Sequence, residues 1–177
     1  MASQSSRETL KPLFREDVIR AAVAAMARDL AKDPPNLVVG ILTGAVFFAS
    51  DLMRALYLEG VQPDLDFVRL SSYGAGTVTT GSADMTAPPF LPIEGRDVLL
   101  VDDILDTGIT MREAHKLYSE RGAKRVRIAV LLDKPARRAA PVKPDFVGFD
   151  CPDRFVAGYG IDKGHAHRGA PFVGVPE

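Results

Sequence analysis

Apolar residues recur along the chain with the periods of helices and of buried strands. Between residues 15 and 30 the spacing is helical, through Val18, Ala22, Val23, Met26, Ala27 and Leu30. Two further helices are predicted over residues 45–58 and 107–121, each followed by a glycine that suits a helix end. Short apolar runs predict strands at residues 37–42, 65–70, 96–103, 125–132 and 146–149.

Strands and helices alternate in this order, which favours an α/β fold with a central, mostly parallel sheet flanked by helices. The chain has 177 residues, enough for one well-buried core. It shows no internal repeat and no linker-like segment. We therefore expect a single domain over residues 1–177.

Composition narrows the possible classes of partner. Lysine and arginine number 22 against 23 acidic residues, whereas proteins that bind nucleic acid usually carry a basic excess. No apolar run approaches the roughly 20 residues that span a bilayer. Cys151 is the only cysteine, which excludes an intrachain disulfide. We expect no nucleic acid partner, no membrane and a cytoplasmic location.

Residues 71–82, SSYGAGTVTTGS, lack the spacing needed to pack a core. Long irregular stretches in compact domains are often lids or binding loops, and a surface loop without function is the alternative. Ordering such a glycine-rich segment costs about 1–2 kcal/mol per residue in backbone entropy. We expect a lid that is mobile without ligand and ordered when closed.

The most informative segment is residues 98–110, VLLVDDILDTGIT. In open α/β sheets, ligands bind at the carboxyl ends of strands, and the turn that opens the next helix presents unpaired N–H groups and a positive dipole to an anion. Gly108 permits close approach of the backbone, and Thr107 and Thr110 add hydroxyl donors. A 5′-phosphate fits this turn.

Asp102 and Asp103 end the strand that precedes the turn. Two carboxylates repel a phosphate unless ribose hydroxyls or a Mg²⁺ ion shared with a diphosphate intervene. The pair therefore indicates a sugar phosphate together with a divalent metal. The alternative is that Asp106 only caps the helix and that the two acids are exposed charges.

Residues 98–110 resemble the PRPP-binding motif of the type I phosphoribosyltransferases (PRPP is phosphoribosyl diphosphate), and this thirteen-residue match is specific. From about residue 37 to the C-terminus the chain is similar to the hypoxanthine-guanine branch. The resemblance implies a small hood built from about residues 1–14 and 144–177. It also implies Mg²⁺-dependent transfer of ribose 5-phosphate from PRPP to a 6-oxopurine. Family members are commonly dimers or tetramers, so we expect a homodimer or a homotetramer.

The resemblance assigns two loops around PRPP. Residues 40–45 match the diphosphate loop, with Thr43 and Gly44 next to PRPP and a non-proline cis peptide between Leu42 and Thr43. Many relatives carry Lys or Arg where this chain has Thr43, so contacts from the backbone are the ones expected there. Ser72 and Tyr73 match the start of the catalytic lid, which excludes water.

The same resemblance assigns the remaining roles. Asp106 would lie near N7 of the purine and act as general base. Asp162 would lie at the purine and hold a second Mg²⁺, and Arg168 would contact the diphosphate. The residues implied at PRPP along the motif are Asp102, Asp103, Asp106, Thr107, Gly108, Ile109 and Thr110, and the metal ligands are Asp102, Asp103 and Asp162.

The purine side follows from three residues. Residues 131–135, LLDKP, match the stretch that carries the family's base-recognition lysine, so the resemblance implies this role for Lys134. A lysine can donate to a 6-oxo group but cannot accept from a 6-amino group, which separates oxopurines from adenine. By resemblance, Phe155 stacks on the base and the backbone of Val156 reads its edge. Without the family pattern, Lys134 would be a solvated turn residue and Phe155 a core aromatic.

Three other functions stay open on the sequence. One is a related transferase that prefers xanthine or adenine. Another is an RNA-binding regulator similar to the pyrimidine attenuation proteins, which tend to carry Tyr where this chain has Asp106. The third is a pseudo-enzyme that only senses nucleotide, although no carboxylate of the motif is missing. His165 and His167 are interpreted as solvated, because two ligands alone do not make a metal site.

Overall fold

The computed structural model describes residues 9–71 and 84–177. In chain order the elements are β1 (Leu10–Phe14), α1 (Glu16–Ala31), β2 (Leu37–Ile41), α2 (Val46–Leu58), β3 (Asp64–Ser71), β4 (Asp84–Ala87), β5 (Asp97–Leu105), α3 (Ile109–Glu120), β6 (Arg125–Asp133), the 3₁₀ turn η1 (Pro135–Arg137), β7 (Phe146–Asp150) and β8 (Val173–Pro176).

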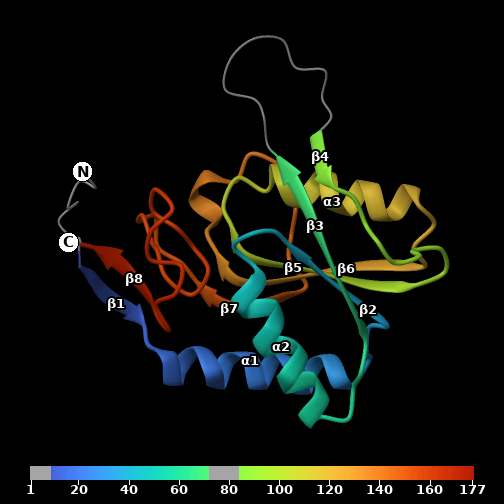
Figure 1. The fold of residues 1–177 in the computed structure, drawn as a ribbon, viewed down its shortest axis with the longest axis horizontal. Coiled ribbons are helices and arrows are strands. Elements are labelled where there is room, and N and C mark those ends of the chain that lie inside the picture. The colour runs from blue at the N-terminus through green and yellow to red at the C-terminus, as the bar shows by residue number, and fades with distance from the viewer. Residues whose placement is uncertain (1–8, 72–83) are drawn as a thin grey trace, which may run out of the picture.

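The main sheet has the strand order β4-β3-β2-β5-β6-β7 (Figure 1). Its strands run parallel from β3 to β7, and only the edge strand β4 is antiparallel. Every residue of β2 is buried, as expected for a strand that is covered on both faces. The predicted α/β class with a mostly parallel sheet is confirmed.

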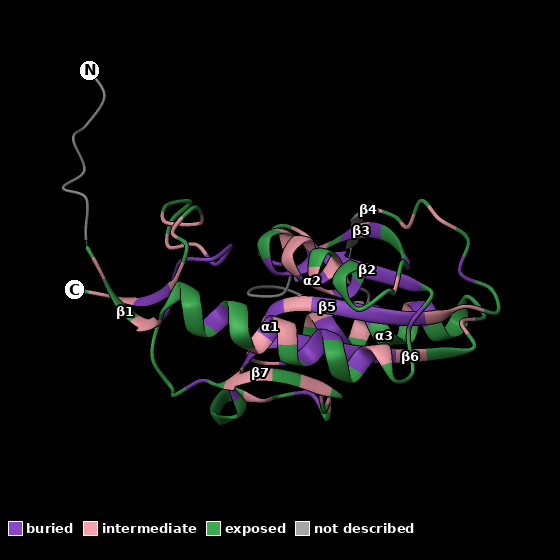
Figure 2. Cartoon of the chain, turned by 90° about the horizontal axis from the view of Figure 1, so that it is seen from below, coloured by how far each residue is buried: buried purple, intermediate pink, exposed green. Residues whose placement is uncertain are grey.

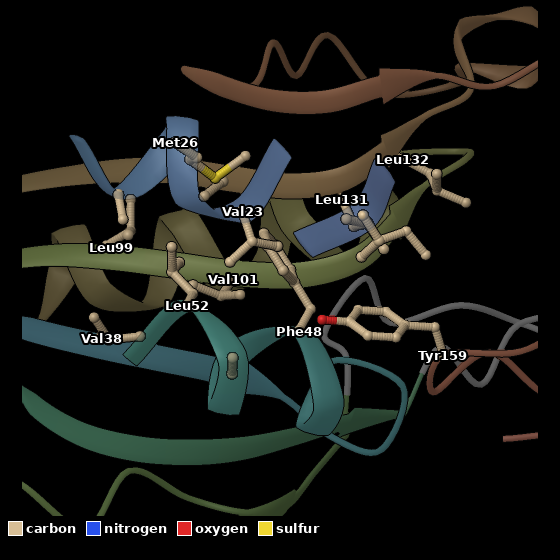
Figure 3. Packing of buried hydrophobic residues seen from close by; sticks show 14 of the residues in the cluster. Val23, Met26, Val38, Phe48, Leu52, Leu99, Val101, Leu131, Leu132 and Tyr159 are labelled. Atoms are coloured by element: carbon tan, nitrogen blue, oxygen red, sulfur yellow. The ribbon is translucent and has the colours of Figure 1, made fainter. Parts of the chain in front are cut away.

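Helices cover both faces of this sheet. Val38, Leu99 and Leu131 point to the side of α1 and α2, where they pack with Val23 and Phe48 (Figure 3). The alternate strand residues pack against α3 on the other face, in a cluster that includes Val39, Leu100, Val130, Met111 and Tyr118. Figure 2 shows most of β5 as buried, and buried residues alternating with exposed ones along α1.

A second, two-stranded sheet joins the two ends of the described chain. β1 pairs antiparallel with β8, from Leu10 opposite Pro176 to Phe14 opposite Val173. The ring of Phe14 stacks on Phe149 of β7 with centroids 4.4 Å apart, which attaches this small sheet to the main one. The small antiparallel sheet expected for the hood is therefore present (Figure 1), but β7, which the predicted bounds of 144–177 assign to the hood, belongs to the main sheet.

The structure corrects three details of the predicted elements. β5 continues to Leu105 instead of ending at Asp103, because its pairing with β6 continues to Leu105 opposite Asp133. On α1, Val18 is exposed and Ile19 is buried, since packing against α2 and β7 selects the face that contains Ile19. Strands β1, β4 and β8 were not predicted.

Candidate active site

Three segments meet at the carboxyl edge of the sheet because neighbouring parallel strands end there. They follow β2 (residues 42–45), lie at the end of β5 (residues 102–110) and follow β6 (Lys134). The cis peptide predicted between Leu42 and Thr43 is present. The structure therefore brings together the predicted diphosphate loop, the residues that match the PRPP motif and the lysine predicted to recognise the purine.

Asp102 and Asp103 lie inside β5 and form a tight acidic pair. The backbone N–H of Asp103 donates to Oδ1 of Asp102 at 3.0 Å, and that of Ile104 donates to Oδ1 of Asp103 at 2.8 Å. Burial raises the pKa of Asp102 well above its usual range, and the charge of Asp103 adds to this. Burial also raises the pKa of Asp103, against hydrogen bonds and the charge of Arg168 that lower it. The interpretation of these two acids as exposed charges is wrong.

The loop after β2 touches both β3 and the hood. Arg69 of β3 donates from Nη2 to Oγ1 of Thr43 at 3.1 Å. On the hood side, Gly160 has a φ of 102°, and a Cβ there would lie 2.0 Å from the carbonyl oxygen of Gly44. The absence of a side chain at Gly160 thus allows the hood to approach this loop closely.

The turn before α3 ends at Gly108. This glycine is the N-cap residue of α3 and adopts a left-handed φ of 80°. The first helical N–H, that of Ile109, donates to Oγ1 of Thr107 at 3.5 Å and not to Asp106, so the interpretation of Asp106 as a helix cap is wrong. The carbonyl oxygen of Thr107 accepts hydrogen bonds from the N–H groups of Ala139 and Ala140 at 2.9 and 3.0 Å. Ile109 is exposed and Thr110 half-buried at the first turn of the helix. The turn is held from one side and open at the other.

Asp106 carries two unlike carboxylate oxygens. Oδ2 lies 3.5 Å from Nη1 of Arg137 in an ion pair. Oδ1 is buried and has no hydrogen-bond partner within the described part of the chain. A buried oxygen without a donor is costly. This one is therefore suited to accept a proton from a ligand.

Lys134 is buried, with 5% of its surface exposed. Its N–H donates to the carbonyl oxygen of Leu105 at 3.0 Å, and its Nζ lies 3.2 Å from Oδ1 of Asp153. The lysine is thus fixed directly beside the turn that contains Asp106. The alternative interpretation of Lys134 as a solvated turn residue is therefore wrong.

The hood contributes the remaining predicted residues. Phe155 exposes 56% of its surface, so it is not a core aromatic, and Lys163 Nζ lies 5.9 Å from its ring centroid. Val156, next to it, is buried. The hood therefore presents an aromatic face to the outside.

Asp162 and Arg168 form an ion pair within the hood. Nη2 of Arg168 donates to Oδ1 of Asp162 at 2.7 Å, and Nη1 donates to the carbonyl oxygen of Gly160 at 2.6 Å. Oδ2 of Asp162 accepts from the N–H of His165 at 3.0 Å. Over residues 9–71 and 84–177, no three His, Cys, Asp or Glu side chains form a group that could hold a metal.

Ser71, the first residue of the predicted lid, ends β3, whereas Ser72, Tyr73 and the rest of the predicted lid lie outside the described residues. Sequence reasoning in turn missed Arg69, Asp153 and Arg138, which contact Thr43, Lys134 and the turn around Asp106. In the sequence these three residues are distinguished only by their charge, and charged residues are common on any protein surface. The sequence therefore offers no specific reason to select them.

Comparison with known proteins agrees with this geometry. Residues 10–163 match the model of the phosphoribosyl transferase domain, and the chain belongs to this family, with its type I fold. It is similar to the hypoxanthine-guanine phosphoribosyltransferase of Bacillus subtilis, with 39% identity over 170 residues that cover 93% of this chain and 92% of the relative. The hypoxanthine phosphoribosyltransferase of Escherichia coli is 37% identical over 173 residues, covering 95% and 96%.

A solved structure extends the similarity to the whole fold. The hypoxanthine phosphoribosyltransferase of Staphylococcus aureus superposes with a TM-score of 0.89 and 35% identity, covering 100% of this chain and 96% of that one. Among the residues with a described structure, no helix combines the length and apolarity needed to cross a membrane.

Proposed function

We propose that this phosphoribosyltransferase moves the 5-phosphoribosyl group from PRPP to hypoxanthine or guanine and releases diphosphate. Relatives that match nearly the whole chain are purine salvage enzymes of this type. One observation carries the proposal. The backbone N–H of the buried Lys134 donates to the carbonyl oxygen of Leu105, so the residue whose ammonium would donate to a 6-oxo group directly adjoins the residues that match the PRPP motif.

PRPP is held along the end of β5 and the turn that follows. Its ribose hydroxyls donate to Asp102 and Asp103, and its 5′-phosphate lies over the turn of residues 107–110, where helix N–H groups and the Thr107 and Thr110 hydroxyls donate to it. This arrangement matches the donors and acceptors of a phosphorylated sugar. It also separates the phosphate from the two carboxylates by the ribose.

The acidic pair fits Mg²⁺. Two adjacent carboxylates supply the hard oxygen ligands that this ion prefers. Burial and the charge of Asp103 raise the pKa of Asp102, and a cation bound there would favour its ionised form. Asp102 and Asp103 would hold one ion and Asp162 a second. When bound, Mg²⁺ neutralises charge that develops on the departing diphosphate.

The purine lies between the hood and the turn. Phe155 stacks on its face, the backbone of Val156 reads its edge, and Lys134 donates to its 6-oxo group. The bond from ribose C1 to diphosphate breaks as N9 of the purine attacks C1. Oδ1 of Asp106 accepts the proton that the purine loses at N7, because this buried oxygen has no other donor among the described residues.

The diphosphate is surrounded by residues of three segments. Thr43 and Gly44 contact it through their backbone, Arg168 adds a positive charge from the hood, and Ser72 and Tyr73 close over it. A homodimeric or homotetrameric assembly and a cytoplasmic location remain predictions. So does the division into a domain of residues 1–177 with its hood.

Purified protein should be assayed for PRPP consumption with hypoxanthine, guanine, xanthine, adenine and uracil in turn, with Mg²⁺ and after its removal by EDTA. We expect turnover with hypoxanthine or guanine, little with adenine, and none without the metal. Adenine that matched hypoxanthine in kcat/KM would contradict the proposal. A preference for xanthine would change the proposed substrate but leave the protein a phosphoribosyltransferase.

A further inference from the structure

A partly buried cation at the carboxyl edge of the sheet has no role in the scheme above. Arg138 follows η1 directly, and its side chain is 16% exposed. Its Nε donates to the carbonyl oxygen of Asp106 at 2.9 Å, and its Nη1 donates to that of Val142 at 2.7 Å. Its Nη2 donates to the carbonyl oxygen of Leu105 at 3.0 Å and also to Oδ1 of Asp133. The guanidinium thus links the ends of β5 and β6.

These contacts cover one side of the turn that precedes α3. The carbonyl oxygens of Leu105 and Asp106 accept from Arg138, and that of Thr107 accepts from Ala139 and Ala140. The stem of Arg138 also packs under Gly108, where a Cβ would lie 2.9 Å from its Cδ. Three consecutive carbonyl groups are therefore held toward residues 138–140.

Because each peptide unit is planar and trans, fixing these carbonyl groups also fixes the direction of the N–H groups that follow them. In such a peptide the C=O of one residue and the N–H of the next point in opposite directions. Holding the carbonyls of Leu105, Asp106 and Thr107 on one side therefore turns the N–H groups of residues 106–108 to the other side. A turn free to rotate would expose carbonyl oxygens, which repel a phosphate.

We propose that Arg138 is a positioning residue for PRPP, which fixes the turn of residues 105–108 with its N–H groups toward the 5′-phosphate. The proposal rests on the proposed function in one respect, that the anion is this phosphate. Arg138 itself does not touch the substrate. Asp133 balances the charge of this partly buried guanidinium.

An arginine with little exposed surface can also act on stability alone, and the chain offers a matched control. Arg127 lies near the opposite end of β6 with its side chain 10% exposed. Its Nη1 donates to the carbonyl oxygen of Asp33 at 2.8 Å, and its Nη2 donates to Oδ1 of Asp97 at 3.1 Å. It combines the same types of bond far from the turn, so its loss reports the general effect of removing a buried arginine.

The test compares Arg138→Lys and Arg138→Gln with Arg127→Lys and Arg127→Gln. Thermal unfolding identifies a temperature at which each variant is folded, and calorimetry there measures Kd for PRPP with Mg²⁺, followed by KM and kcat. Since a misplacement of about 1 Å can cost ~10²-fold, we expect Kd and KM for PRPP to rise at least about tenfold in Arg138→Gln. The KM for purine should change far less. Arg138→Lys should fall between wild type and Arg138→Gln, because an ammonium lacks the planar fork of donors.

The Arg127 variants should lose stability but keep wild-type affinity for PRPP. Wild-type affinity in the Arg138 variants would overturn the proposal. An equal loss of affinity in the Arg127 variants would overturn it too, since general loosening would then be sufficient. If Arg138→Gln does not fold, Arg138→Lys decides. A wild-type chain that binds PRPP but makes no nucleotide would contradict the proposed function alone, because Kd needs no turnover.

Discussion

The carboxylate of Asp103 lies directly against the backbone of Gly44. A Cβ at Gly44 would lie 1.9 Å from Oδ2 and 2.5 Å from Cγ of Asp103, well inside van der Waals contact. Gly44 belongs to the loop after β2, and Asp103 to the neighbouring strand β5. The two predicted PRPP-binding segments therefore touch at Gly44, where any Cβ would displace the Asp103 carboxylate.

This contact predicts the effect of Gly44→Ala. The methyl group has to displace the Asp103 carboxylate, which can rotate, so the fold should persist while the acidic pair is disturbed. We expect kcat/KM for PRPP to fall by about tenfold or more, with a smaller effect on thermal stability. Gly169→Ala is the control, because a Cβ there meets nothing within 4 Å. A fully active Gly44→Ala enzyme would show that the position of Asp103 does not matter.

Asp106→Asn should fold normally but lose turnover by about 10²–10⁴-fold, the usual contribution of a general acid or base. Stability should be nearly unchanged, because α3 is capped at Gly108 and its cap does not use the Asp106 side chain. Steady-state kinetics in both directions and a thermal melt check these two expectations separately. Wild-type turnover in the variant would remove Asp106 from the chemistry.

Lys134→Gln should weaken the discrimination against adenine. Glutamine can accept as well as donate a hydrogen bond, so it tolerates a 6-amino group that lysine rejects. We expect the ratio of kcat/KM for adenine to that for hypoxanthine to rise by about tenfold or more, mainly through loss of hypoxanthine turnover. Asp153→Asn is the matched variant. It removes the ion pair with Lys134 at 3.2 Å but keeps the lysine, and should therefore keep the preference. Loss of the preference in Asp153→Asn would assign discrimination to the ion pair.

Cys151 should react slowly with alkylating reagents in the folded protein. Burial raises the pKa of its thiol, and the nearby carboxylates act in the same direction against the charge of Lys134. The thiolate is the reactive form, and at a given pH the raised pKa makes it a smaller fraction of Cys151 in the folded protein than in the unfolded chain. Because this fraction grows with pH, the rate of alkylation should rise with pH. Iodoacetamide labelling followed by mass spectrometry, with the protein in concentrated guanidinium chloride as reference, measures the difference. Equal rates in the two states would contradict a buried, protonated thiol.

The sequence predicted which helices and strands carry the site more accurately than it predicted where each of them ends. Apolar runs and helical spacing identify a segment from its own residues, and β2, β5 and β6 were found this way. The end of β5 was placed two residues early, at Asp103. Its extension depends on pairing with Asp133 of β6, which no local pattern reports. Strands β1 and β8 went unpredicted for the same reason, since each is stabilised by the other across almost the whole chain.

The sequence by itself determined the class of fold and the residues that match the PRPP motif, because both depend on the order of nearby residues. Only the tertiary structure decided that Lys134 is buried beside the turn, that Phe155 is exposed and that Arg138 holds three carbonyl groups of two different segments. Burial and hydrogen bonding between distant residues depend on how the strands are ordered in the sheet. That order places residues 105 and 138 in contact although 32 residues separate them in sequence, more than any local period of side chains can specify.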